Sequence, residues 1–239
     1  MQALLALSLL TVLPGLGLAT SLHPQGDRVQ RWCAAPALGL AALAIAFGAL
    51  VLLGVWSFLV AILVTVLLQV WGLLTLRRAP SPSVSERDAW FRAQRAQPRM
   101  WLGGLIALLA LLPVLVADTP QGVDWVGFTA LAHHLSERGA FVSASGHSWL
   151  YPPGLPAMLA FLADITGLPL QSVGLAVGQF SLVALLLGMC SALDRHGAGG
   201  EGILAMMLAV GVFSKVLDSG WPTVLSLALI PFNLGRMLE

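Results

Sequence analysis

The side chains that could do chemistry in this chain are concentrated between residues 118 and 151. Asp118 and Asp124 could each act as a general base, because a carboxylate within hydrogen-bond reach of a hydroxyl group can accept its proton. Cationic side chains are the natural partners of negative charge that develops in such a reaction. The candidates for this second role are Arg138, His133, His134, His147 and, much later in the chain, Lys215. Residues of these two kinds favour acid–base chemistry or anion binding.

Each candidate also has a structural interpretation that needs no site. Asp124 could simply cap a helix, because the free N–H groups and the helix dipole favour a carboxylate at the helix start. His133 and His134 are adjacent, so their side chains diverge on a helix, which argues against a metal pair. Arg138 could pair with lipid headgroups, and Lys215 precedes an aspartate by three residues, which favours a local ion pair. Both interpretations stay open at the level of the sequence.

The stretch that begins at Asp124, DWVGFTALAHHLSERG, is predicted to form an amphipathic helix. Its apolar residues recur at steps of three and four, which places them on one helix face. These residues are Trp125, Phe128, Leu131, Ala132 and Leu135. The opposite side is polar and charged. A helix of this kind outside a membrane span is expected to lie in the plane of the membrane interface.

A second stretch, YPPGLPAMLAFLADITG, places rigid residues at the start of a short apolar run. Pro152 and Pro153 favour an extended approach, since a residue before proline avoids the helical region. Gly154 relieves crowding, and a third proline suits the first turn of a helix. Residues 155–165 are too few to span a bilayer, and Asp164 would be costly at bilayer depth. We therefore expect a half-inserted helix with both ends on one side, which floors a preformed outer pocket beneath the amphipathic helix.

The elements that position these residues are predicted to be membrane helices. Hydrophobic residues make up 58% of the 239-residue chain and charged residues only 10%, which is unlike a soluble domain. Apolar stretches of about 20 residues cross a bilayer, and backbone groups in lipid require helices rather than open sheets. The predicted spans are residues 4–22, 33–53, 57–76, 101–117, 171–193, 203–217 and 223–234. The predicted fold class is all-α, a polytopic membrane bundle of about seven spanning helices with the amphipathic and half-inserted helices in an outer loop.

Arginine residues set the predicted orientation. The stretch between residues 77 and 99 has an excess of basic residues, and short loops rich in arginine stay cytoplasmic. The acidic residues in this stretch are Glu86 and Asp88. The basic residues are Arg77, Arg78, Arg87, Arg92, Arg95 and Arg99. The loop 118–151 and the N-terminus then lie on the exterior. We predict a multi-pass protein of the cell membrane, with an N-terminal three-helix segment over residues 1–99 and a second membrane segment over residues 100–239.

The order of features in the second segment resembles a known family. A spanning helix is followed by Asp124, an aromatic residue four positions on, then Ala132, Leu135 and Gly139, a variable polar loop, and YPPGLPAMLAFLADITG. This order resembles the first outer loop of the GT-C class of membrane glycosyltransferases, which includes protein mannosyltransferase-like and aminoarabinose transferase-like enzymes. The stretches LLTVLPGLGLATSL and SGWPTVLSLALIPFNLG are also similar to large bacterial membrane proteins thought to belong to that class.

The resemblance implies a transferase that takes a sugar from a polyprenyl-phosphate donor to a glycan, lipid or protein acceptor on the exterior face. It implies that Asp124 is the general base near the acceptor, with Asp118 as the fallback. The residues expected to bind substrate are Arg138, His133, His147, Tyr151 and Lys215. Two departures stand out. The family's frequent Asp-Glu pair is Asp124-Trp125 here, which removes a second carboxylate for a metal or acceptor, and Tyr151 stands where some members have lysine.

The remaining expectations concern partners and alternatives. Cys33 and Cys190 lie in apolar stretches without metal-type spacing and are expected to be buried thiols. The sequence supports no cofactor and no nucleic-acid partner, and a divalent metal is possible but unsupported. At 239 residues the chain is short for the family, so we expect an N-terminal fragment or a reduced bacterial homologue. The alternative function is that of a non-catalytic polytopic membrane protein, such as a polyprenyl-lipid binder, a transporter segment or an assembly partner.

Overall fold

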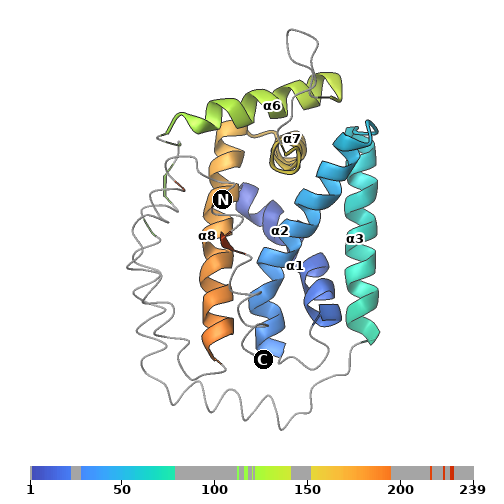
Figure 1. The fold of residues 1–239 in the computed structure, drawn as a ribbon, viewed down its shortest axis with the longest axis vertical. Coiled ribbons are helices and arrows are strands. Elements are labelled where there is room, and N and C mark those ends of the chain that lie inside the picture. The colour runs from blue at the N-terminus through green and yellow to red at the C-terminus, as the bar shows by residue number, and fades with distance from the viewer. Residues whose placement is uncertain are drawn as a thin grey trace.

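All regular secondary structure in the described part of the chain is helical. The computed structural model describes residues 2–22, 28–78, 112, 116–117, 120, 122–140, 152–194, 216, 223 and 227–228. Its helices are α1 (Gln2–Leu22), α2 (Arg28–Leu52), α3 (Phe58–Arg78), α6 (Asp124–Arg138), α7 (Gly154–Thr166) and α8 (Leu170–Asp194) (Figure 1). Four of them, α1, α2, α3 and α8, are long and apolar enough to cross a membrane. The all-α prediction is therefore confirmed, and four of the predicted spans are helices of spanning length.

The other three predicted spans, residues 101–117, 203–217 and 223–234, lie outside the described residues apart from isolated positions. Of those positions, Val216 and Ala228 are buried. Val216 belongs to the main apolar core, and Ala228 packs with Ala37 of α2 and Ala184 of α8. These contacts place Val216 and Ala228 against the bundle.

Glycine residues bring the first three helices to backbone contact. Gly15 in α1 lies against the backbone of Ala35 in α2, and Gly39 in α2 lies against the backbone of Thr11 in α1. A side-chain carbon at either glycine would collide with the opposing carbonyl group. Gly72 of α3 approaches the α1 backbone in the same way. Small residues serve this purpose in membranes because helices there associate through close packing.

A proline inside α1 is compensated from α3. Pro14 has no N–H group, so the carbonyl of Leu10 loses its partner within the helix. The side-chain amide of Gln69 supplies one instead, donating to the Leu10 oxygen at 2.7 Å and to the Leu9 oxygen at 3.1 Å. An unpaired carbonyl in lipid would be costly. Gln69 is the only amide side chain in α3, and its place in an apolar helix has this structural cause.

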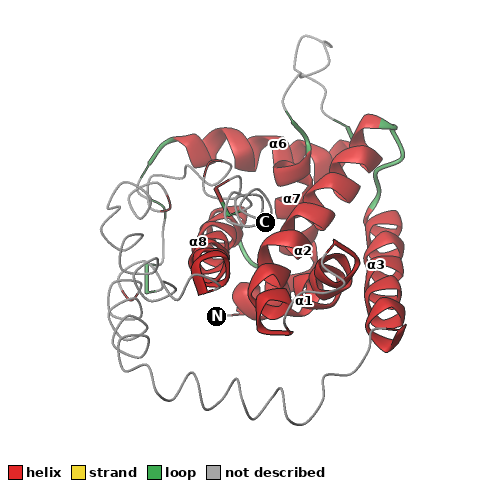
Figure 2. Ribbon diagram, turned by 60° about the horizontal axis from the view of Figure 1, so that its bottom comes forward, coloured by secondary structure: helices red, strands yellow, loops and turns green. Residues whose placement is uncertain are grey.

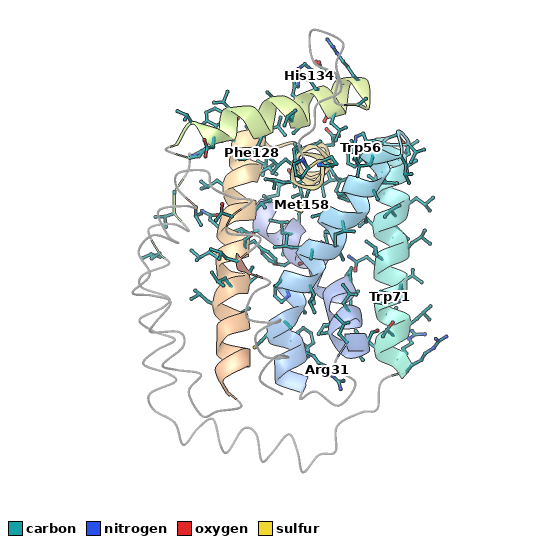
Figure 3. The ribbon with its side chains drawn as sticks, in the orientation of Figure 1. Arg31, Trp56, Trp71, Phe128, His134 and Met158 are labelled. Atoms are coloured by element: carbon teal, nitrogen blue, oxygen red, sulfur yellow. The ribbon has the colours of Figure 1, made fainter. Side chains whose placement is uncertain are left out.

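The bundle has two different ends. Arg31 near the start of α2 and the last turn of α3, with Arg77 and Arg78, lie at one end (Figure 3). At the opposite end α6 lies across the tops of the long helices, and α7 lies beneath it and is seen end-on in Figure 1. Figure 2 shows α3 at one edge of the bundle, with α1 and α2 between it and α8.

Candidate functional site

The candidate site is the end of the bundle that α6 and α7 cover. α6 packs against α7 and α8 through Leu131, Ala132 and Leu135, which are buried. Trp125 and Phe128, on the same face, are half-buried and pack against the same core. The apolar face of α6 thus rests on protein, and buried side chains fill its contact with α7.

α7 is held in place by the α2–α3 hairpin. The ring of Phe47 lies edge-on to Phe161 of α7 at 4.9 Å and to Trp56 at 5.6 Å between centroids. Gly154, the first residue of α7, touches α2 directly, since a side-chain carbon there would lie 2.5 Å from the carbonyl oxygen of Ala44. The glycine of the YPPGLP stretch is therefore explained by this close approach of α7 to α2.

α7 has 13 residues, and those from Leu155 to Leu162 are all buried. It ends at Gly167, whose φ of 67° is the left-handed conformation that glycine adopts without strain. The side-chain amide of Gln2 in α1 donates to the carbonyl oxygen of Thr166 at 3.2 Å. This contact places the start of α1 at the same end of the bundle as α6 and α7. The predicted helix over residues 155–165 is thus present, and it is too short to span.

Asp124 is the first residue of α6, and its side chain is exposed. The N-cap position is Val123, which has no side-chain hydrogen bond to the helix. Asp124 therefore does not cap the helix, although its position in the first turn keeps its carboxylate near the positive end of the helix dipole. The carboxylate can be approached from the outside of the bundle, as a general base requires.

The histidines lie one to two turns before the C-terminal end of α6. His133 Nε2 is 3.2 Å from a carboxylate oxygen of Glu137, and both side chains are more than half exposed, at 62% and 53%. The Nδ1 atom of His134 is buried without a hydrogen-bond partner among the described residues. Figure 3 shows His134 on the α6 helix at the top of the bundle. His133 is thus exposed while His134 is only partly exposed, as expected for adjacent residues on different sides of a helix.

α6 separates the predicted base from the predicted cations. Arg138 is fourteen residues after Asp124, and a rise of about 1.5 Å per residue puts their backbones roughly 21 Å apart. His133 is roughly 13 Å away by the same rise. One small reacting group cannot touch Asp124 and Arg138 together. This separation follows from the helix alone and could have been read from the sequence.

The other candidates, Asp118, His147, Tyr151 and Lys215, lie outside the described residues. Among the described residues, no three His, Cys, Asp or Glu side chains gather so that they could hold a metal ion. The sequence analysis also did not identify Gln69 as a structural residue. Its position as an isolated amide side chain in an apolar helix could have indicated this role. No protein-family model, curated protein or solved structure matches this chain.

Proposed function

We propose that this chain is a membrane glycosyltransferase-like protein, which transfers a sugar from a polyprenyl-phosphate donor to an acceptor on the exterior face. The observation that carries the proposal is the placement of Asp124. Its exposed carboxylate lies in the first turn of α6, at the end of the bundle opposite the basic residues Arg77 and Arg78. Because arginine-rich ends stay cytoplasmic, the proposal puts Asp124 on the exterior.

In the proposed reaction an acceptor hydroxyl attacks the anomeric carbon of the donor sugar. Asp124 takes the hydroxyl proton as the new C–O bond forms, and the bond from the sugar to the phosphate oxygen breaks. The polyprenyl phosphate leaves with that bonding pair. A positioned base of this kind contributes about 10²- to 10⁴-fold to the rate.

The leaving phosphate needs a cation or N–H donors near its developing charge. Arg138 and His133 lie too far along α6 to share one reacting centre with Asp124, so they would bind a more distant part of the donor or acceptor. His147, Tyr151 and Lys215 are the remaining proposed substrate-binding residues, and Asp118 is the fallback base. The proposal involves no metal.

The test is transfer from radiolabelled polyprenyl-phosphate sugars by the purified full chain. Asp124→Asn should lower the rate at least 100-fold, because the amide cannot accept the proton. The matched control is Asp164→Asn, which changes another exposed carboxylate, on α7 at the same end of the bundle. This variant should retain transfer. Asp118→Asn tests the fallback. No transfer from any donor, or transfer that neither Asp124→Asn nor Asp118→Asn changes, would refute the proposal.

The alternative proposal is a non-catalytic protein that binds a polyprenyl lipid or assembles with another membrane protein. The separation of Asp124 from the cations on α6 favours it, because a base and a cation this far apart cannot act on one reacting centre. Saturable binding of polyprenyl phosphate without transfer of any donor sugar would support this alternative.

A further inference from the structure

α3 carries a continuous apolar stripe on its outward side. Leu59, Leu63, Val66, Val70 and Leu73 follow one another at steps of three and four, and each is between 42% and 76% exposed. α3 also buries the smallest share of its apolar window among the four long helices, 17% against 72% for α8. In the described part of the chain it packs mainly on α1, which agrees with its place at the edge of the bundle (Figure 2).

The stripe ends in cationic side chains. Arg77 follows Leu73 by four residues and therefore continues the same stripe, and Arg78 is its neighbour; both are exposed. From Leu59 to Arg77 the helix rises about 27 Å, close to the roughly 30 Å of a bilayer's hydrocarbon core. The arginines thus stand where the apolar surface of α3 stops and the headgroups of one leaflet begin.

A tryptophan marks the same boundary. Trp71 lies six residues before Arg77, and its ring packs over Gly17 of α1 while 38% of the residue stays exposed (Figure 3). Tryptophan rings gather at membrane interfaces, where one side is apolar and the other wet. An apolar track, an interfacial ring and two fixed positive charges are therefore arranged along one helix in the order of a phospholipid's acyl chains, glycerol region and phosphate.

We infer that the Arg77 end of α3 is a binding site for a phospholipid with an anionic headgroup. Arg77 and Arg78 would bind the headgroup, for which guanidinium groups provide paired N–H donors, and the acyl chains would lie along Leu63, Val66 and Val70. The charge of this end selects an anionic lipid over a zwitterionic one. The inference is independent of sugar transfer.

The test is lipid binding to the purified full chain, measured by native mass spectrometry with phosphatidylglycerol and with phosphatidylcholine of the same acyl chains. The unmodified chain should bind phosphatidylglycerol more tightly. The double variant Arg77→Gln, Arg78→Gln should lose about fivefold in phosphatidylglycerol affinity for each charge removed and should bind phosphatidylcholine as before. Arg77→Lys with Arg78→Lys should retain most of the preference, because it keeps the charge.

Asp164→Asn is the control at the opposite end of the bundle, since it removes one exposed charge there and should leave phosphatidylglycerol affinity unchanged. A measurement on the unmodified chain does not depend on the variants folding: raising the salt concentration should reduce the preference for phosphatidylglycerol. Equal affinity for the two lipids, or an unchanged preference in the Arg77→Gln, Arg78→Gln variant, would overturn the inference.

Discussion

Pro14 and Gln69 lie in different helices and act on the same carbonyl group. The proline removes a donor from α1, and the amide of Gln69 restores one from α3 at 2.7 Å. Two residues that would each be unfavourable alone in an apolar helix are thus tolerated together. Pairs of this kind depend on which helices pack side by side, and a pattern along one helix does not contain that information.

The first prediction concerns this pair. Gln69→Leu should lower the free energy of unfolding by about 1–2 kcal/mol, because it leaves the carbonyl of Leu10 unpaired. In a Pro14→Ala background the loss should be smaller, since the alanine has an N–H group for that carbonyl. Unfolding in detergent, followed by circular dichroism for the four members of the double-mutant cycle, measures the coupling.

The informative comparison is between the two backgrounds. The same loss from Gln69→Leu with Pro14 present and with Pro14→Ala would mean that the amide acts independently of the proline. Thr65→Val is a useful control on the same helix. It removes a hydroxyl that donates to the carbonyl of Ala61 within α3 at 2.7 Å, so its effect should not depend on residue 14.

At the scale of elements, the contact between α2 and α7 depends on glycine. Gly154→Ala would place a methyl group 2.5 Å from the Ala44 oxygen, so α7 would have to move away from α2. We expect it to lower the free energy of unfolding by about 1–3 kcal/mol. Gly127→Ala in α6 is the matched control, because a methyl group there meets nothing within 4 Å. That change should be stabilising by about 0.5–1 kcal/mol, since alanine restricts the unfolded chain.

The midpoint temperature of thermal unfolding should therefore fall in Gly154→Ala and rise in Gly127→Ala. If Gly154→Ala were as stable as Gly127→Ala, the close approach of α7 to α2 would be wrong. The position of α7 would then depend on its other contacts, which are the ring contacts of Phe161, the hydrogen bond from Gln2 to Thr166 and the packing of α6.

α7 also supports a prediction about pH. It is not among the four helices long enough to span, and partial burial raises the pKa of the Asp164 carboxyl above its ordinary value of 3.8. A raised pKa in the folded protein means that the folded state holds this proton more tightly than the unfolded state. The stability from Asp164 is therefore complete below pH 3.8 and is lost as pH rises through the folded-state pKa.

Asp164→Asn should abolish the loss of stability that accompanies ionisation of Asp164. It also removes a negative charge from the last turn of α7, where the helix dipole disfavours one. We expect the variant to be more stable near pH 7 by about 0.3–1 kcal/mol and no more stable below pH 3.8. Unfolding measured across this pH range tests both parts. An Asn variant whose stability falls with pH as steeply as that of the unmodified chain would contradict the assignment.

The sequence predicted which segments are helices better than it predicted where they end. The predicted span 33–53 is the helix Arg28–Leu52, which begins earlier because backbone hydrogen bonds continue through polar residues that a hydropathy pattern excludes. The predicted helix 155–165 matches Gly154–Thr166, because proline and glycine set its ends. The helix-to-helix contacts of Gly15, Gly39 and Gly154 could not be predicted, since they depend on which backbones meet in three dimensions.

At the scale of the whole molecule, the two ends of the bundle differ in what they carry. The basic end holds Arg31, Arg77 and Arg78, and the other end holds α6 and α7. This arrangement places the candidate site at the end of the bundle that α6 and α7 cover, which no single residue of the site would indicate. The sequence identified Asp124 as a candidate, but the distance of Asp124 from Arg138 limits which residues can act with it.

The last prediction concerns which end faces outward. Ser136 is exposed on α6 and Arg78 is exposed at the basic end, so cysteine substitutions at these positions report on opposite sides of the membrane. Because arginine-rich ends stay cytoplasmic, a membrane-impermeant maleimide should label Ser136→Cys in intact cells and Arg78→Cys only after permeabilisation. The unmodified chain, which contains Cys33 and Cys190, gives the background. Labelling of Arg78→Cys alone in intact cells would invert the bundle, place Asp124 in the cytoplasm and rule out sugar transfer at the exterior face.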